Sequence, residues 1–348
     1  MFAEILGQEP VKQALGRAIV ASRFPPAILL AGPEGVGKRT LALAAARAVL
    51  CAGDPPGCGA CAHCRRIDRS LAALGEWQRD AAGRTDDPTR LNHRVHPDLV
   101  LVEPWKTGIK IDQIRDLVGE IASSPFEARS RVFVIDDAHL MNEAAANALL
   151  KSLEEPPQSS HLVLVSASPQ NLLPTIRSRC QLLRCGPIAS AALERRLVEA
   201  HALAPEEARL RVALAGGSLK AALSFDSDEF RERREEALRF LEEAGGDLER
   251  LQAAERLGEN EDLAPLLLAL RSLLRDLLAL RSGAPEAALL NADLAPRLRA
   301  LASGPLGASA GALGERTAEI LLALKGNASR PLSADLLGEA LAAADPRR

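Results

Sequence analysis

The chain has 348 residues, more than one hydrophobic core usually serves, and at about 150 residues per domain we expect two or three domains. Hydrophobic residues make up 47% and charged residues 26%, which excludes a disordered or fibrous chain. The formal charge of -3 and the aromatic content of 3% argue against a protein that holds nucleic acid alone, through a basic field or rows of stacked rings. The first residues lack the basic flank and uninterrupted apolar stretch expected of a secretory leader, and the sequence has no run of about 18 apolar residues without charge. We therefore expect a cytoplasmic protein with no membrane partner.

The first half of the chain alternates short apolar runs with amphipathic segments, which is typical of an α/β parallel sheet covered by helices. Strands are predicted at 27–31, 98–102, 131–135 and 161–167, and helices at 39–50, 111–123 and 142–155. The segment 70–94 is polar and carries Gly and Pro after a first apolar turn, which predicts a surface excursion. Strand signals end at Cys185, and the remainder is predicted to be helical.

These patterns predict three domains. The first is an α/β nucleotide-binding-type domain over 1–185, with a metal-binding module at about 51–66. A small helical domain over 186–227 and a larger helical domain over 228–348 follow. Within the last, the leucine-rich segment 262–281 predicts a helix that is buried on more than one side.

A glycine-rich turn between the first strand and the next helix has the spacing of a phosphate-binding loop (P-loop). Glycines allow the tight turn, backbone N–H groups point at phosphate, and Lys38 would reach the terminal phosphates. The candidate nucleotide-binding residues are Gly32, Gly35, Val36, Gly37, Lys38, Arg39, Thr40 and Asp136. ATP with Mg²⁺ is therefore a candidate ligand, and a turn that the fold needs without any phosphate is the alternative.

Two departures from the P-loop pattern argue against hydrolysis. Arg39 stands where a Ser or Thr hydroxyl normally holds magnesium, and Thr40 lies about 100° further round the helix, so it does not simply replace that ligand. The acidic pair Asp136-Asp137 ends a strand where an active ATPase of this type has Glu second, and a misplacement of about 1 Å can cost on the order of a hundredfold in rate. A turn that caps the strand end is the alternative for this pair.

Four of the six cysteines lie in one 14-residue window: Cys51, Cys58, Cys61 and Cys64. This spacing predicts a tetrahedral Zn²⁺ site, which is structural because four protein ligands leave no open position. A disulfide or an adventitious cluster is the alternative, which a reducing compartment disfavours. His63 is predicted to be a bystander, and Cys180 and Cys185 to be small buried hydrophobes.

The order of these motifs resembles the delta-prime family of bacterial DNA polymerase III clamp-loader subunits. The similarity rests on the P-loop followed at once by four cysteines, and on HPDLVLVEP (96–104), IDQIRDL (111–117), AAANALLKSLEEPP (144–157) and TIRSRC (175–180). It covers 1–185, continues through GGSLKAALSF (216–225), and is weaker to LLRDLLAL (273–280) and the terminal helices. The same motifs recur in the gamma/tau subunit. This sequence resembles delta-prime rather than gamma/tau in having Arg39 after the loop lysine, in having Asp137 in the acidic pair, and in lacking the long carboxy-terminal extension of tau.

The resemblance implies an AAA+ domain, a helical lid and a helical collar in a ring with the gamma/tau and delta subunits. That ring uses ATP to open the beta sliding clamp and place it on primer-template DNA. It further implies that the chain acts mainly as a stator, a rigid part of the ring, and supplies Arg179, in Ser178-Arg179-Cys180, to a neighbouring ATPase site. Guanidinium groups delivered in this way stabilise charge on the transferring phosphoryl group in GTPases. Within the DNA polymerase III holoenzyme, the chain alone would have little or no ATPase and no polymerase activity.

Two sensor positions of the ATPase relatives also differ here. The chain has Ser166-Ala167-Ser168 in place of a sensor Thr, and Lys220, which lacks the bidentate fork of Arg. The rival interpretation is an active gamma-like AAA+ ATPase motor. A third is a stand-alone DNA-binding protein with a zinc knuckle, which the charge and aromatic content disfavour. For Arg179 the alternative is a surface or structural arginine.

Overall fold

The computed structural model describes residues 1–81, 92–243 and 263–325. No helix within these described ranges is both long and apolar enough to cross a bilayer. Two compact units account for the chain: Met1–Ala202 with Ala215–Ala221, and Leu203–Leu214 with Ala222–Arg348. The division into three domains with breaks after 185 and 227 stays a prediction.

The first unit is built on a six-stranded sheet in the order β2-β3-β4-β5-β1-β6, parallel throughout except that β2 runs antiparallel to β3. The strands are β1 (Ala27–Ala31), β2 (Asn92–His96), β3 (Leu99–Val102), β4 (Arg131–Ile135), β5 (Ser160–Ser166) and β6 (Gln181–Arg184). Every residue of β1, β3, β4 and β5 is buried, as expected for a parallel sheet that is covered on both faces. The predicted α/β fold class is confirmed.

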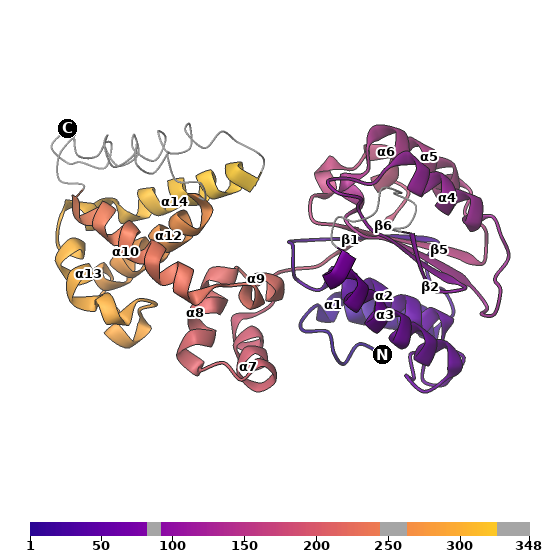
Figure 1. Cartoon of the computed structure of the whole chain (residues 1–348), viewed down its shortest axis with the longest axis horizontal. Coiled ribbons are helices and arrows are strands. Elements are labelled where there is room, and N and C mark those ends of the chain that lie inside the picture. Colours follow the sequence, from indigo (N-terminus) through magenta and orange to yellow (C-terminus); the bar gives the residue numbers. More distant parts are fainter. Residues whose placement is uncertain (82–91, 244–262, 326–348) are drawn as a thin grey trace. The chain divides into compact units, whose positions relative to one another are not determined.

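Helices cover both faces of this sheet, with α1, α2 and α3 on one side and α4, α5 and α6 on the other (Figure 1). Their bounds are α1 (Glu9–Val20), α2 (Lys38–Leu50), α3 (Ala62–Ala81), α4 (Ile111–Ile121), α5 (Glu143–Glu154) and α6 (Pro174–Arg177), with 3-10 turns η2 (Ala138–Leu140) and η3 (Pro169–Asn171). On the α4 and α5 side, Phe133 packs in one buried cluster with Ile114 and Leu149. The sheet is thus covered by apolar packing, and the loops that follow β1 and β4 carry the candidate site.

The two edge strands, β2 and β6, are the strands that the sequence did not predict. Only Val95 and His96 are buried in β2, and β6 is mostly exposed, so neither has the apolar run of a central strand. Within the predicted surface excursion over 70–94, α3 continues to Ala81 and β2 begins at Asn92, and the excursion itself stays a prediction. Ile67 and Leu74 lie two helical turns apart and are both buried on α3. The helix therefore keeps a buried apolar face although many of its other residues are polar. Residues 82–91 lie outside the described part.

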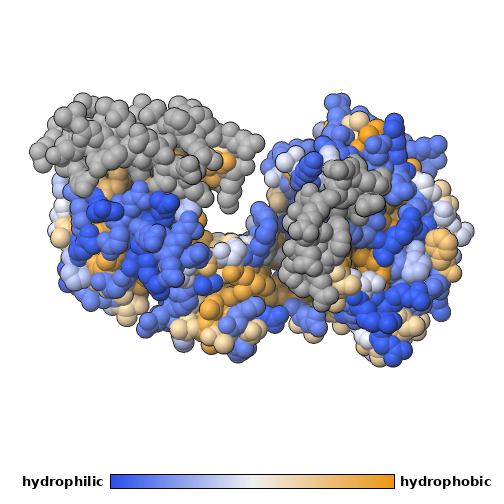
Figure 2. Space-filling model, in the orientation of Figure 1, coloured by the Kyte–Doolittle hydropathy of each residue, from blue (hydrophilic) through white to orange (hydrophobic). Residues whose placement is uncertain are grey.

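Beyond β6 the described chain is helical: α7 (Ser190–His201), α8 (Pro205–Ala215), α9 (Leu219–Leu223), α10 (Ser227–Glu243), α12 (Leu263–Arg281), α13 (Ala295–Ala302) and α14 (Pro305–Lys325), with 3-10 turns η4 (Glu286–Ala288) and η5 (Ala292–Leu294). In the second unit, α12 is buried at consecutive positions such as Leu266-Leu267 and Leu273-Leu274. It packs with α10, α13 and α14 in one apolar cluster, which confirms a helix buried on more than one side. Most of the surface in view is hydrophilic, with apolar surface near α9, where Leu223 is 41% exposed (Figure 2).

Candidate functional site

The P-loop lies at the carboxyl end of β1, where a parallel sheet places its ligand-binding loops. Gly37 ends the loop in the left-handed conformation, with φ of 91°, and α2 begins at Lys38. Lys38 is buried, and its ammonium donates to the carbonyl oxygens of Gly32 (2.8 Å) and Pro33 (2.6 Å). Burial lowers the pKa of Lys38, while Cys185 and the acidic pair after β4 oppose that change. The predicted loop residues thus form the turn between β1 and α2, and Val36 within it is fully buried.

Residues 218–220, which belong to the first compact unit, pack against this loop. The carbonyl oxygen of Gly35 accepts the N–H groups of Leu219 (3.0 Å) and Lys220 (3.4 Å). Gly35 has φ of 74°, and a Cβ there would lie 2.0 Å from Ser218 Oγ, so neighbouring atoms would have to shift to admit a side chain. Lys220 Nζ also lies 2.6 Å from Glu34 Oε1 at an exposed position. The sensor-position lysine is therefore paired with a carboxylate of the P-loop itself.

Arg39 reaches across the carboxyl edge of the sheet to two acidic side chains. Its Nη1 contacts Glu103 Oε1, at the end of β3, and lies 3.5 Å from Asp136 Oδ2, at the end of β4. Both carboxylates are nearly buried, with 11% and 13% of the side chain exposed. Burial raises the pKa of Asp136 to about 6, and the Arg39 guanidinium opposes that rise. Asp136 is thus paired with a fixed positive charge.

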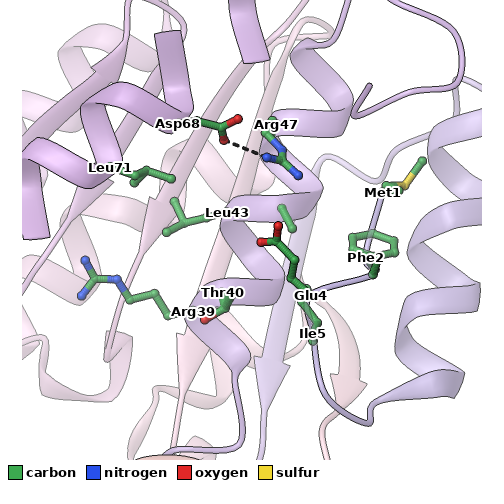
Figure 3. Close-up of a pocket in the computed structure, with 12 residues that line it drawn as sticks. Met1, Phe2, Glu4, Ile5, Arg39, Thr40, Leu43, Arg47, Asp68 and Leu71 are labelled. Carbon is green, nitrogen blue, oxygen red and sulfur yellow. Dashed lines mark hydrogen bonds and ion pairs between the residues drawn. The ribbon is translucent and has the colours of Figure 1, made fainter. Parts of the chain in front are cut away.

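Asp137 and Thr40 lie apart from this contact. Asp137 adopts the left-handed conformation, with φ of 44°, and precedes η2. Thr40 lines a cavity of about 270 Å³ between the N-terminal segment, α2 and α3. Its other lining side chains include Leu43 and Leu71, and the Arg47–Asp68 ion pair (2.7 Å) closes one side (Figure 3). Arg39 and Thr40 therefore both line this pocket.

The four clustered cysteines follow the other end of α2, and their sulfur atoms all lie within 4.8 Å of one another. Cys51 Sγ lies 3.6 Å from Cys58 Sγ and 3.8 Å from Cys61 Sγ. A tetrahedral ion with metal–sulfur bonds of about 2.3 Å separates its sulfurs by about 3.8 Å, so these distances fit one ion. Cys64 completes the set and is fully buried. The four thiols can therefore bind a single metal ion.

Backbone N–H groups point at the sulfurs of this cysteine cluster. Cys58 and Gly53 donate to Cys51 Sγ (3.4 and 3.3 Å), and Cys61 donates to Cys58 Sγ (3.3 Å). Burial raises the pKa of Cys61, but N–H groups, including that of Cys64, outweigh it and bring the pKa to about 6. Burial raises the pKa of Cys64 to about 12. The backbone N–H groups of these turns thus favour the thiolate form of Cys61, the form that binds a metal.

His63 belongs to a second cluster, with His96 and Glu127. The N–H of Asp98 donates to His96 Nδ1 (3.0 Å), so the ring proton lies on His96 Nε2, which donates to His63 Nδ1 (2.9 Å). A neutral His96 ring that bound a metal through Nε2 would carry its proton on Nδ1. That proton would face the N–H of Asp98, which is itself a donor. The cluster is therefore a hydrogen-bonded chain that joins the cysteine module to β2.

Arg179 lies on the surface just after α6, far along the chain from the P-loop. Its Nη2 is 2.7 Å from Glu154 Oε1, at the end of α5, and its Nη1 donates to the carbonyl oxygen of Thr175 (2.9 Å). The side chain is 34% exposed, so it can be reached from outside the chain. The neighbouring Cys180 is buried, as is Cys185, and burial raises the pKa of Cys180 to about 11. Both cysteines are placed as core residues.

The sequence prediction missed Glu103, whose carboxylate contacts Arg39 and lies 2.8 Å from His93 Nε2. Glu103 directly follows the apolar run of β3, and acidic residues after parallel strands share one edge of the sheet. That position was the available signal. His93 had none, because it lies on an unpredicted edge strand.

The P-loop after β1, the acidic pair after β4 and the insertion of β5 between these strands define a P-loop α/β protein of the AAA+ type. Residues 7–73 and 71–189 match the family model of the DNA polymerase III, delta subunit. DNA polymerase III subunit delta' of Pseudomonas aeruginosa is 38% identical over 268 residues, 74% of this chain and 72% of the relative. The Bacillus subtilis delta' subunit is 34% identical over 236 residues, 68% of this chain and 64% of the relative. The chain belongs to the delta' family of DNA polymerase III subunits.

The DNA polymerase III subunit tau of Bacillus subtilis is also similar, at 32% identity over 231 residues. That match covers 64% of this chain but 36% of tau, so the similarity ends well short of the full tau subunit.

Proposed function

We propose that this protein is a clamp-loader subunit in DNA replication that does not hydrolyse ATP itself. Membership of the delta' family supports the clamp-loader role. The observation that carries the non-hydrolytic role is the contact of Arg39 with Asp136 and Glu103, because this arginine replaces the hydroxyl that holds magnesium in active P-loop enzymes. In the ring, the subunit assembles with gamma/tau and delta. Through that assembly it serves the beta sliding clamp and primer-template DNA.

In this proposal Arg179 acts on the neighbouring subunit. A guanidinium delivered in trans stabilises charge on a transferring phosphoryl group, an effect of about 10³ or more in GTPases. The exposure of Arg179 and its short bridge to Glu154 support this role, because the side chain is held at the surface without being buried. The bridge would have to open, or share the guanidinium, when a nucleotide arrives.

The cysteine module is proposed to hold structural Zn²⁺ through Cys51, Cys58, Cys61 and Cys64. Four thiolates complete a tetrahedral shell and leave no place for substrate. When bound, the ion supplies a crosslink between the end of α2 and the start of α3, and it takes no part in phosphoryl chemistry.

Steady-state ATP hydrolysis tests the proposal. The purified full chain is expected to show no turnover above background. The loader reconstituted with gamma/tau, delta, beta clamp and primed DNA is expected to lose at least about tenfold of its stimulated ATPase with Arg179→Ala. Arg177→Ala, an exposed change two residues away, is the matched control and should leave that rate unchanged.

Two results would contradict the proposal. Unchanged ATPase with Arg179→Ala in a fully assembled ring would remove the arginine's role. Robust turnover by the chain alone, abolished by Lys38→Ala, would replace the stator with a gamma-like motor.

A further inference from the structure

The P-loop fold implies a magnesium ion, and the residues of this chain do not fit one. Magnesium takes octahedral oxygen ligands at about 2.0–2.1 Å, and a P-loop supplies one of them from the hydroxyl after its lysine. Arg39 occupies that position on the first turn of α2 and offers only N–H donors. Thr40 follows one residue later, about 100° further round α2, so it does not simply supply the missing oxygen.

The Arg39 guanidinium lies among the acidic groups that would draw a cation to this place. It contacts Glu103 and is 3.5 Å from Asp136 Oδ2, so one positive group bridges the ends of β3 and β4. His93 Nε2 flanks the other oxygen of Glu103 at 2.8 Å. A divalent ion entering here would meet a like charge and lose access to the Asp136 oxygen that the arginine faces.

Asp136 also has a physical need for this partner. Its side chain is 13% exposed, and burial raises its pKa to about 6, while Arg39 opposes that rise. Without a nearby cation, a carboxylate so buried would favour the protonated form. The arginine thus does for Asp136 what a bound cation does in an active P-loop site.

We propose that Arg39 is a built-in substitute for magnesium: its guanidinium occupies the cation position between Asp136 and Glu103 and excludes Mg²⁺ from this P-loop. The inference rests on the proposed non-hydrolytic function and makes it specific. Any nucleoside polyphosphate that meets Lys38 and the loop N–H groups does so without a metal ion.

The test measures binding of a fluorescent methylanthraniloyl-ATP to the full chain in excess EDTA and in excess MgCl₂. For the wild type, the two dissociation constants are expected to agree within about twofold, or binding is absent in both buffers. Arg39→Thr restores the hydroxyl and frees Asp136, so Mg²⁺ should strengthen its binding by at least about tenfold. Arg39→Lys keeps the charge and should respond to Mg²⁺ no more than the wild type does.

Either of two results overturns the proposal: a tenfold Mg²⁺ effect in the wild type, or no Mg²⁺ effect in a folded Arg39→Thr variant. Circular dichroism melting establishes whether that variant is folded. If it is not, melting of the wild type with ATP decides, because a melting temperature that rises only when Mg²⁺ is added contradicts the exclusion. ATP hydrolysis by the wild type would instead overturn the proposed function, so the two failures are distinct.

Discussion

The two candidate sites lie at opposite ends of one helix, and they retain different parts of their motifs. At the start of α2, the P-loop has its glycines, its lysine and its helix N-terminus, but Arg39 has replaced a metal-binding side chain. After the end of α2, the cysteine cluster has all four sulfur atoms at spacings that fit one ion. A loop backbone can persist because the fold needs it, whereas the chemistry depends on single side chains. Changes at either end should separate these two contributions.

The largest effect is expected at the cysteine cluster, which has all four of its candidate ligands. Cys64→Ser removes a buried ligand, so zinc should fall below one equivalent and the melting temperature should drop by roughly 10 °C, at about 2–4 °C per kcal/mol. Elemental analysis of protein purified without added metal, with calorimetry, measures both. Cys180→Ala is the matched control for a buried thiol outside the cluster, and its zinc content should stay at one equivalent. Full zinc content in folded Cys64→Ser protein would contradict the four-sulfur site.

A smaller loss is expected from the backbone of the P-loop. Gly35→Ala combines a left-handed φ with a Cβ placed 2.0 Å from Ser218 Oγ, and should lower the free energy of unfolding by about 3 kcal/mol. Gly37→Ala has the left-handed strain but open space around it, and should cost about 1 kcal/mol. Urea unfolding compares the two variants. Equal losses in the free energy of unfolding would show that the packing of Ser218 against Gly35 adds nothing to the cost of the Cβ.

The buried Asp136 predicts a dependence on pH. Its folded pKa of about 6 lies above the ordinary value of 3.8, so the folded protein holds the proton between these values and its free energy of unfolding falls as pH rises through this window. Asp136→Asn removes that titration, so its stability relative to wild type should improve by roughly 2 kcal/mol from pH 4 to pH 7. Urea unfolding at both pH values measures the change. A constant difference between the two proteins would contradict it.

The smallest effect is expected from the exposed pair Lys220–Glu34. Both side chains are 71% exposed, so solvent screens the bridge and its loss should change the free energy of unfolding by less than about 1 kcal/mol. A double-mutant cycle with Lys220→Ala and Glu34→Ala isolates the coupling. A coupling free energy well above 1 kcal/mol would contradict this prediction and show that the ion pair contributes substantially to the stability of the P-loop.

The sequence by itself determined the features that depend on nearby residues. The P-loop spans a few positions between β1 and α2, and the four cysteines fall within one short window. The central strands are continuous apolar runs because both faces of the sheet are covered, so β1 and β4 match the predicted 27–31 and 131–135. The loss of a hydroxyl after Lys38 was likewise visible in the order of residues alone.

Tertiary structure alone decided what meets across long separations in the chain. Arg39 and Glu103 are 64 positions apart, and they meet because β3 and the P-loop end at the same edge of one sheet. The contact of Ser218 with Gly35 depends in the same way on how a distant segment folds back. The edge strands β2 and β6 escaped prediction because hydrogen bonds to one neighbour, rather than an apolar run, hold them in place. Local patterns record what a segment buries, and the order of strands decides which charges share a site.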